Sequence, residues 1–78
     1  MSEEQLLKSI GARIREIRKE KNMTQTKLAE VCEIEKANLS RIESGQTNVT
    51  VLTLLKIGTA LDTPVAEFLK SSAVQLVN

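Results

Sequence analysis

The apolar residues of this 78-residue chain recur at helical spacing along almost its whole length. A first helix is predicted from about Glu3 to Lys21, and its buried face repeats every three or four residues, as Leu6, Ile10, Ile14 and Ile17. Strand-like alternation is never sustained, and β-branched residues do not cluster between turn signals. The spacing therefore predicts an all-α fold.

A short second helix is predicted after a stop at Asn22, a residue type that tolerates the left-handed conformation. Thr24 is a good N-cap, because its hydroxyl can accept a backbone N–H of the first turn that has no partner within the helix. The inward stripe that follows is Leu28, Val31 and Cys32. The second helix therefore starts directly after Thr24.

A third helix follows almost at once, from about Lys36 to Ser44, with Leu39 and Ile42 inward and Gly45 at a left-handed terminus. Roughly three or four residues join the second and third helices. An antiparallel hairpin would give each helix too little length to bury. The two are therefore predicted to cross at a steep angle.

The fourth predicted helix begins after the cap Thr50, ends at Leu61 and is apolar on most sides. We predict that it is central and that other helices pack upon it, with Gly58 at a close approach. Its apolar positions are Val51, Leu52, Leu54, Leu55, Ile57, Gly58 and Leu61.

A fifth helix is predicted to open at Thr63, as N-cap, with Pro64 in its first turn, and to run through about Ser71. The apolar tail AVQLVN follows it. No repeat, low-complexity segment or linker divides the chain, so residues 1–78 are expected to form one domain with a core of about residues 8–70.

The composition argues against several classes of function. Eleven Lys and Arg residues stand against ten Asp and Glu, a formal net charge of +1, so a case for nucleic acid must rest on local patches. Histidine is absent and Cys32 is the one cysteine, so the usual ligands of a zinc site are missing. The acidic residues lie on exposed helical faces beside Lys and Arg. We therefore expect no enzyme, no metal and no cofactor.

The setting of the chain is expected to be the cytoplasm, since a lone cysteine suits a reducing compartment. Cys32 is predicted to pack as a small hydrophobe, with a reactive thiol as the alternative. No apolar run approaches the roughly 20 residues of a membrane span. The start MSEEQLLKS is acidic where a secretory signal would be basic. We expect neither a membrane span nor a small-molecule site.

The outer face of the third helix carries the chemistry of interest. On a helical wheel, the residues opposite Leu39 and Ile42 are Ala37, Ser40, Arg41 and Ser44, with Lys36 and Asn38 at the flanks. Arg or Lys can bond guanine, Asn can bond adenine, and Ala can touch a thymine methyl group. This narrow ridge has a shape able to enter a DNA major groove. An ordinary solvated face is the alternative.

Glu43 lies close to the buried side of the same wheel, so it needs a cationic partner, and Arg18 in the first helix is the candidate. The alternative is a carboxylate at the surface.

With these residues in place, the stretch from Arg13 to Leu69 resembles the Cro and lambda-repressor-like (XRE) helix-turn-helix family of bacterial and phage transcription regulators. The matching elements are Ile14, Arg15 and Arg18; Thr24, Gln25, Leu28 and Ala29; Leu39, Ser40, Arg41, Ile42, Glu43 and Gly45; and Leu54, Leu55, Ile57, Ala60 and Leu61.

The resemblance implies a five-helix domain whose third helix lies in the DNA major groove. It implies base-reading or nearby positions for Lys36, Ala37, Asn38 and Arg41. It implies contacts to the DNA backbone from Thr24, Gln25, Ser44, Thr47 and Asn48. Arg18 and Glu43 correspond to the structural pair of the family. Short members of the family, including restriction-modification controller proteins, dimerise through their last helix.

The chain departs from the family pattern at three positions. Glu33 stands where Gly is common in the turn, and Asp62 replaces another frequent Gly; a left-handed conformation there costs about 1 kcal/mol each. Glu35 replaces the usual Ser or Thr cap of the third helix, and its charge repels phosphate.

Together these features lead us to expect a transcription regulator, repressor or activator, that binds a double-stranded operator with an inverted repeat as a homodimer. Its dimer interface is predicted to contain four apolar residues near the carboxyl terminus: Leu69, Val74, Leu76 and Val77. The alternative is a protein-interaction module that holds a toxin, an enzyme or a larger regulator and binds DNA weakly. Near-zero net charge favours that alternative.

Overall fold

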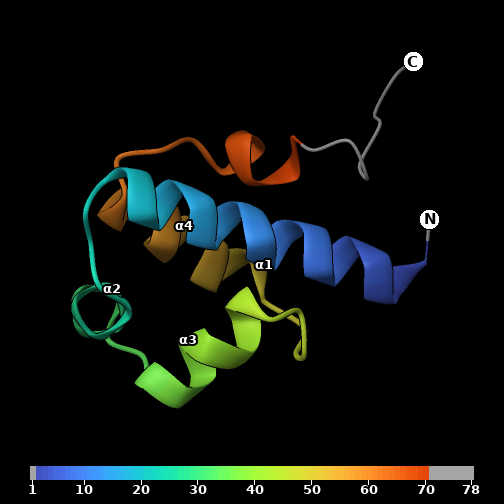
Figure 1. The fold of residues 1–78 in the computed structure, drawn as a ribbon, viewed down its shortest axis with the longest axis horizontal. Coiled ribbons are helices and arrows are strands. Elements are labelled where there is room, and N and C mark those ends of the chain that lie inside the picture. Colours follow the sequence, from blue (N-terminus) through green and yellow to red (C-terminus); the bar gives the residue numbers. More distant parts are fainter. Residues whose placement is uncertain (1, 71–78) are drawn as a thin grey trace.

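The computed structural model describes residues 2–70. This part of the chain forms four α-helices followed by one 3-10 helix and contains no strand: α1 (Glu3–Glu20), α2 (Gln25–Cys32), α3 (Lys36–Glu43), α4 (Val51–Ala60) and η1 (Val65–Leu69). Figure 1 shows α1 running through the molecule, with η1 along one side and α3 on the other. The prediction of an all-α fold is confirmed for these residues.

Hydroxyl side chains fix the start of three of the four α-helices. Ser2 accepts the backbone N–H of Gln5 at 3.1 Å, and Gln5 Oε1 accepts the N–H of Ser2, so this pair caps α1 reciprocally. At α2, Thr24 accepts from the N–H of Lys27 at 3.0 Å. Thr50 caps α4 through the N–H of Thr53. The predicted caps Thr24 and Thr50 are confirmed, whereas Glu35 gives α3 no side-chain cap.

Left-handed residues mark the ends of the helices. Asn22 has φ 58° after α1, and Gly45 has φ 72° after α3, as their residue types predict. Glu33 at φ 57° and Asp62 at φ 51° adopt the same conformation without glycine's freedom. Glu33 is the costlier of these two, because the short polar side chain of Asp bonds locally more readily.

The core lies between α1 and the other helices, and its fully buried side chains are Ile14, Leu28, Leu39, Ile57, Leu61 and Phe68. α1 packs on α3 and η1, while α2 packs on α3 and α4. Gly11 permits the close approach of α1 to the end of α3. A Cβ at this position would lie 2.7 Å from the carbonyl oxygen of Glu43 and closer still to that of Ile42.

The prediction that α4 is central and covered on most sides is wrong. Its inner side buries Leu54, Ile57 and Gly58. On its outer side, three large apolar side chains remain exposed within the described residues: Val51 at 73%, Leu52 at 66% and Leu55 at 50%. These exposed fractions show that no element of residues 2–70 covers the outer side. We call Val51, Leu52 and Leu55 the outer face of α4.

The inward stripe of α2 also differs from the prediction. Val31 is 48% exposed, whereas Ala29 is buried beside Leu28 and Cys32. A helix of eight residues has room for one narrow contact stripe, and residues 28, 29 and 32 share it at helical spacing. Val31 falls on the edge of that stripe.

The prediction of a fifth α-helix from Thr63 to about Ser71 is wrong in type and in bounds. η1 is a 3-10 helix of five residues, closed by bonds such as Glu67 N–H to Pro64 O at 2.9 Å. Pro64 has an extended backbone, with ψ 142°, and Thr63 does not cap the helix. The Thr63 hydroxyl donates instead to the carbonyl of Leu61 at 2.9 Å. Residue 71 lies outside the described residues.

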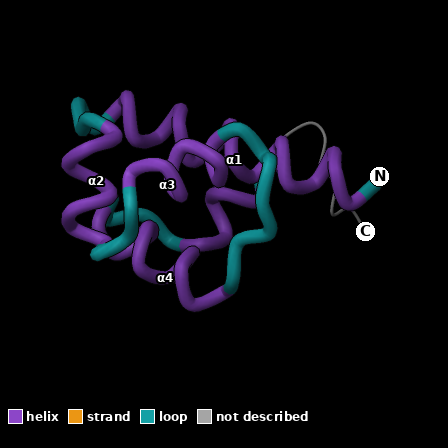
Figure 2. The backbone as a smooth tube through the Cα atoms, turned by 90° about the horizontal axis from the view of Figure 1, so that it is seen from below, coloured by secondary structure: helices purple, strands orange, loops and turns teal. Residues whose placement is uncertain are grey.

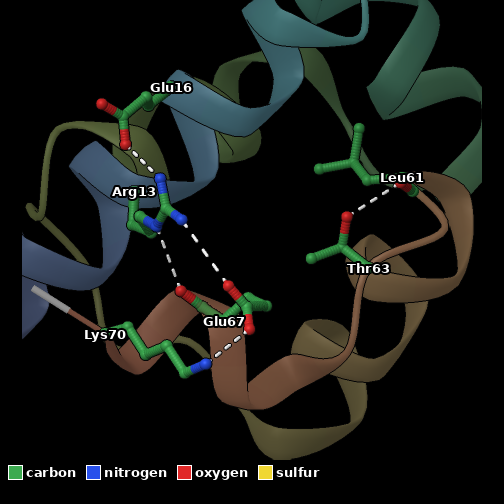
Figure 3. A network of polar contacts seen from close by, with 6 residues as sticks. All are labelled: Arg13, Glu16, Leu61, Thr63, Glu67 and Lys70. Carbon is green, nitrogen blue, oxygen red and sulfur yellow. Dashed lines mark hydrogen bonds and ion pairs between the residues drawn. The ribbon is translucent and has the colours of Figure 1, made fainter.

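Polar contacts hold η1 against α1 (Figure 3). The Nε of Arg13 donates to the backbone carbonyl of Glu67 at 3.2 Å, and its guanidinium lies 3.6 Å from the Glu67 carboxylate. Lys70 donates to the same carboxylate at 2.8 Å, and Arg13 also pairs with Glu16. The hydrogen bond from Lys70 and the charges of Lys70 and Arg13 lower the pKa of Glu67.

No helix among residues 2–70 is long and apolar enough to cross a bilayer.

Candidate nucleic-acid interface

The exposed face of α3 contains the predicted base-reading residues. Lys36, Ala37 and Arg41 are exposed and Asn38 is half-buried, whereas Leu39 and Ile42 on the opposite face are 0% and 3% exposed. α3 therefore divides cleanly into a packing side and a polar outer side. Figure 2 shows α3 lying across the front of the molecule in this view from below, with α2 beside it.

A tight turn joins α2 to α3. The left-handed Glu33 donates its N–H to the carbonyl of Glu30 at 3.1 Å, and Ile34 donates to that of Ala29 at 3.0 Å. α3 then starts at Lys36 and packs directly on α2. The first residues of α3 are thus held near the end of α2, and those of its outer face project from the body of the protein.

A buried ion pair joins α1 to the end of α3. Arg18 Nε donates to Glu43 Oε2 at 2.7 Å, and the terminal Nη2 donates to Oε1 at 3.1 Å. Arg18 is 8% exposed and Glu43 is 7% exposed. The remaining terminal nitrogen of Arg18 donates to the carbonyl of Met23, before α2, at 2.8 Å. One guanidinium therefore ties together three consecutive parts of the fold.

Gln25, the first residue of α2, joins the same cluster. Its Nε2 donates to Glu43 Oε1 at 3.1 Å. A carboxylate can only accept hydrogen bonds here, so the NH2 group rather than the oxygen of Gln25 faces Glu43. Arg18, Gln25 and Glu43 form what we call the α1–α2–α3 polar cluster.

The residues predicted to contact the DNA backbone fall into two groups that are distant in sequence but meet at Gln25 and Ser44, which line one hollow. Thr24 and Gln25 lie at the start of α2. Ser44 ends α3, and Thr47 and Asn48 lie in the connection to α4. Thr24, Ser44 and Asn48 are exposed, while Gln25 and Thr47 are half-buried. Gln25 and the end of α3 thus place polar side chains of both groups next to each other.

A polar hollow of about 370 Å³ opens between α1, the start of α2 and α3. It is lined by Arg15, Arg18, Gln25, Ser40, Glu43 and Ser44. Two guanidinium groups and one carboxylate leave this lining positive. The sequence pattern gives Arg15 no DNA contact, although its spacing of three residues from Arg18 places both on one side of α1.

Several cations of residues 2–70 have no ion-pair partner there. Arg15 at the hollow and Lys36 and Arg41 on α3 are among them, as are Lys19, Lys21 and Lys56 elsewhere, whereas Lys8, Arg13, Lys27 and Lys70 each pair with a carboxylate. Exposed cations without such partners are available to an anion. Glu33 and Glu35 are exposed before α3 and oppose this attraction.

The remaining predicted residue that the structure describes, Leu69 of η1, lies on the other side of α1 from α3. Leu69 is half-buried against the core of its own chain, and Val74, Leu76 and Val77 lie outside the described residues. Cys32 is buried and free, and burial raises the pKa of its thiol against the opposing charge of Lys56. Within residues 2–70, no cluster of three or more metal-binding side chains occurs.

Comparison with known proteins identifies the family. The family model described as helix-turn-helix matches residues 14–68. The chain belongs to the helix-turn-helix family. The match covers the polar cluster, the α2–α3 pair and all of η1 but its last residue, so the resemblance to the Cro and lambda-repressor-like transcription regulators is confirmed.

Individual relatives agree with this assignment. The helix-turn-helix chain is 32% identical over 66 residues to the HTH-type transcriptional regulator SutR of Escherichia coli K12, and this match spans 85% of the chain but 37% of SutR. The restriction-modification controller protein C.AhdI of Aeromonas hydrophila superposes with a TM-score of 0.77 at 35% identity, covering 80% of this chain and 94% of that one.

A third relative was solved with DNA. The biofilm regulator SinR in complex with DNA superposes with a TM-score of 0.73 at 40% identity. This match covers 78% of the helix-turn-helix chain and 98% of the SinR chain.

Proposed function

We propose that this helix-turn-helix chain is a sequence-specific DNA-binding transcription regulator that acts in the cytoplasm as a homodimer on an inverted-repeat operator. The observation that carries the proposal is the division of α3 into a buried apolar side and an exposed polar side, within a domain of this family. The 40% identity to SinR, solved in complex with DNA, supports it.

Each of the four predicted base-reading residues of α3 has a matching base edge. Arg41 and Lys36 are donors for guanine O6 and N7, Asn38 is suited to adenine, and Ala37 to the methyl group of thymine. The flanking groups at Thr24 and Gln25 and at Ser44, Thr47 and Asn48 then hold the register through phosphates. Arg15 joins this second set, because it is exposed, unpaired within residues 2–70 and lines the positive hollow.

The homodimer is supported by the outer face of α4 together with the apolar residues predicted near the carboxyl terminus. Val51, Leu52 and Leu55 are half or more exposed, and such a patch is unfavourable in water. Contact with a second copy across a two-fold axis covers the same patch on both chains. The same axis presents two α3 helices to the two half-sites of an inverted repeat.

The experiment that tests DNA binding is a filter-binding titration with a mixed-sequence duplex at low salt. We expect retention of the duplex that falls steeply as salt rises, because Lys and Arg release counterions from phosphates. Selection from a random duplex library then tests specificity and symmetry. An enriched inverted repeat with half-site centres about 10 bp apart, or a multiple, is expected for the dimer.

The second candidate function is a protein-interaction module, favoured by the net charge of +1 and by the exposed Glu33 and Glu35 beside α3. It predicts weak retention of the duplex at every salt concentration. Salt-dependent retention together with an enriched repeat would exclude it as the main activity.

A further inference from the structure

The polar cluster contains a hydrogen bond that a purely structural ion pair does not require. Arg18 already meets both oxygens of Glu43, at 2.7 Å and 3.1 Å. Even so, Glu43 Oε1 also accepts from Nε2 of Gln25 at 3.1 Å. Glu43 is therefore shared between a buried cation and a half-buried amide at the start of α2.

This shared hydrogen bond sets the direction of the Gln25 amide group. Of the two N–H groups on Nε2, one is used by Glu43, and the hydrogen bonds within residues 2–70 leave the other without a partner. The amide lines the hollow together with the unpaired Arg15 and the hydroxyls of Ser40 and Ser44. The second N–H is thus a donor held in place at a surface of positive charge.

Phosphate is an acceptor-only group, so it can take this second N–H while the first stays on Glu43. Holding a flexible Gln side chain in advance reduces the entropy lost when a ligand binds. The carboxylate does not repel the anion strongly, because Arg18 neutralises it at close range.

We propose that Glu43 is a positioning residue for DNA: it fixes the Gln25 amide so that the remaining N–H donates to a backbone phosphate seated in the hollow beside Arg15. This inference rests on the proposed function. It adds a second role to Glu43, which otherwise only pairs with Arg18. Through this role, a residue at the end of α3 orients the phosphate contact that Gln25 makes at the start of α2.

The first test is NMR of the full chain labelled with ¹⁵N and titrated with a mixed-sequence duplex at low salt. The two Nε2 protons of Gln25 give separate resonances. We expect the proton that faces Glu43 to keep its shift and the other to move as DNA is added. Gln5 is the internal control: it lies at the far amino end of α1, where its oxygen accepts from Ser2.

Three outcomes of this titration would count against the inference. If the α3 backbone amides move while both Gln25 protons stay, no phosphate binds Gln25. If the proton that faces Glu43 moves as well, Gln25 leaves Glu43 on binding. In both cases the positioning role is wrong and the proposed function stands. If the duplex moves no resonance of the protein, the proposed function fails and the positioning role fails with it.

The second test removes the acceptor without stranding a charge. Arg18→Met combined with Glu43→Leu deletes both opposite charges, so the hollow keeps its net charge, and apolar replacement of a buried pair preserves packing. We expect a folded protein by circular dichroism whose affinity for the mixed-sequence duplex is roughly three- to tenfold lower. This variant also identifies the Gln25 proton that faces Glu43.

Gln25→Ala completes the cycle. In the unaltered chain it should lower affinity by a similar factor, and in the Arg18→Met, Glu43→Leu background it should cause no further loss. A structural role alone predicts full affinity for the folded double variant, and equal effects of Gln25→Ala in the two backgrounds. Either result would overturn the positioning role. The NMR titration needs no substitution and decides the question if the double variant does not fold.

Discussion

Within residues 2–70, α1 makes two arginine–glutamate contacts with other elements, one on each of two sides, and the two differ in burial and in distance. On the side of α3, the side chains of Arg18 and Glu43 are 9% and 3% exposed, and Arg18 Nε lies 2.7 Å from Glu43 Oε2. Arg13 and Glu67, facing η1, are 25% and 33% exposed, with 3.6 Å between the charged atoms. The first contact is shielded from water and the second is not.

The difference shows which neighbour of α1 is held in a fixed place. A shielded pair has a defined geometry, and loss of one partner leaves a buried charge. A solvated pair is screened by water and salt, and its partners exchange easily. α3, with the proposed reading face, is attached by the shielded pair. η1 is attached by the fully buried Phe68 together with the solvated contact.

The largest expected effect comes from breaking the shielded pair on one side. Arg18→Ala or Glu43→Ala should each lower the free energy of unfolding by about 3–5 kcal/mol, because the remaining charge stays buried without its partner. The double replacement should cost less than the sum of the two. Urea melts of the three variants measure this, with Glu67→Ala as the matched control. Additive losses would show that the two side chains act independently.

The next effect concerns the face that the shielded pair holds. Arg41→Ala should relax preference at one base pair, by about 1–3 kcal/mol against the cognate site, if Arg41 bonds guanine with two hydrogen bonds. Gln25→Ala should instead weaken cognate and scrambled sites evenly. Fluorescence anisotropy titrations with the cognate and the scrambled duplex give the ratio of the two affinities. An unchanged ratio for Arg41→Ala would refute its assignment as a base reader.

A smaller effect is expected at the turn before α3. Glu33→Gly should raise the free energy of unfolding by up to about 1 kcal/mol, because glycine adopts φ near 57° without the side-chain penalty. It should also strengthen binding to any duplex by removing a negative charge. Glu35→Gln is the matched control, since it removes a charge where φ is −72°. Equal stability changes in the two variants would mean that the conformation of Glu33 costs nothing.

The smallest effect belongs to the solvated contact. Lys70 and Arg13 lower the pKa of Glu67 below its ordinary value of 4.5, so the folded chain takes up this proton at a lower pH than the unfolded chain does. The contribution of Glu67 is therefore present above that ordinary value and fades as the pH falls below it. Glu67→Gln should slightly reduce the free energy of unfolding at pH 7. It should also make that free energy fall less steeply as the pH is lowered. Urea melts from pH 7 to 3 with 1 M salt as a comparison would measure this. A loss of free energy of unfolding as large as that caused by Glu43→Ala would contradict the difference between the shielded and the solvated contact.

Much of the helical framework follows from local signals. The predicted start of α1, its stop at Asn22 and the caps Thr24 and Thr50 all agree with the structure, because capping and left-handed ends depend on a few neighbouring residues. The apolar spacing also places Leu39 and Ile42 correctly on the buried side of α3.

The errors occur where burial depends on elements distant in sequence. The apolar character of α4 does not reveal that no described helix covers Val51 and Leu52. The pattern at Thr63 and Pro64 suits a helix start, but the buried Phe68 and the extended Pro64 restrict the segment to a single 3-10 turn region. Gly11 gives no signal of its role either, since its importance comes from the carbonyls of α3 opposite it.

The candidate site shows the same limit. Residue types and wheel positions suffice to propose Lys36, Asn38 and Arg41 as readers, because exposure on a short helix follows from its buried stripe. The hydrogen bond between Gln25 and Glu43 joins residues 18 positions apart and depends on the packing of α2 against α3. No local sequence pattern predicts this hydrogen bond.

The division of α3 into a buried and an exposed side affects how the sequence of such a protein can evolve. Three residues, Leu39, Ile42 and Glu43, are buried and hold this eight-residue helix to the body. Lys36, Ala37 and Arg41 take no part in that attachment, so substitutions there leave stability nearly unaltered. If α3 reads DNA as proposed, a gene duplicate can acquire a new operator in single substitutions, each of which yields a folded protein on the same scaffold.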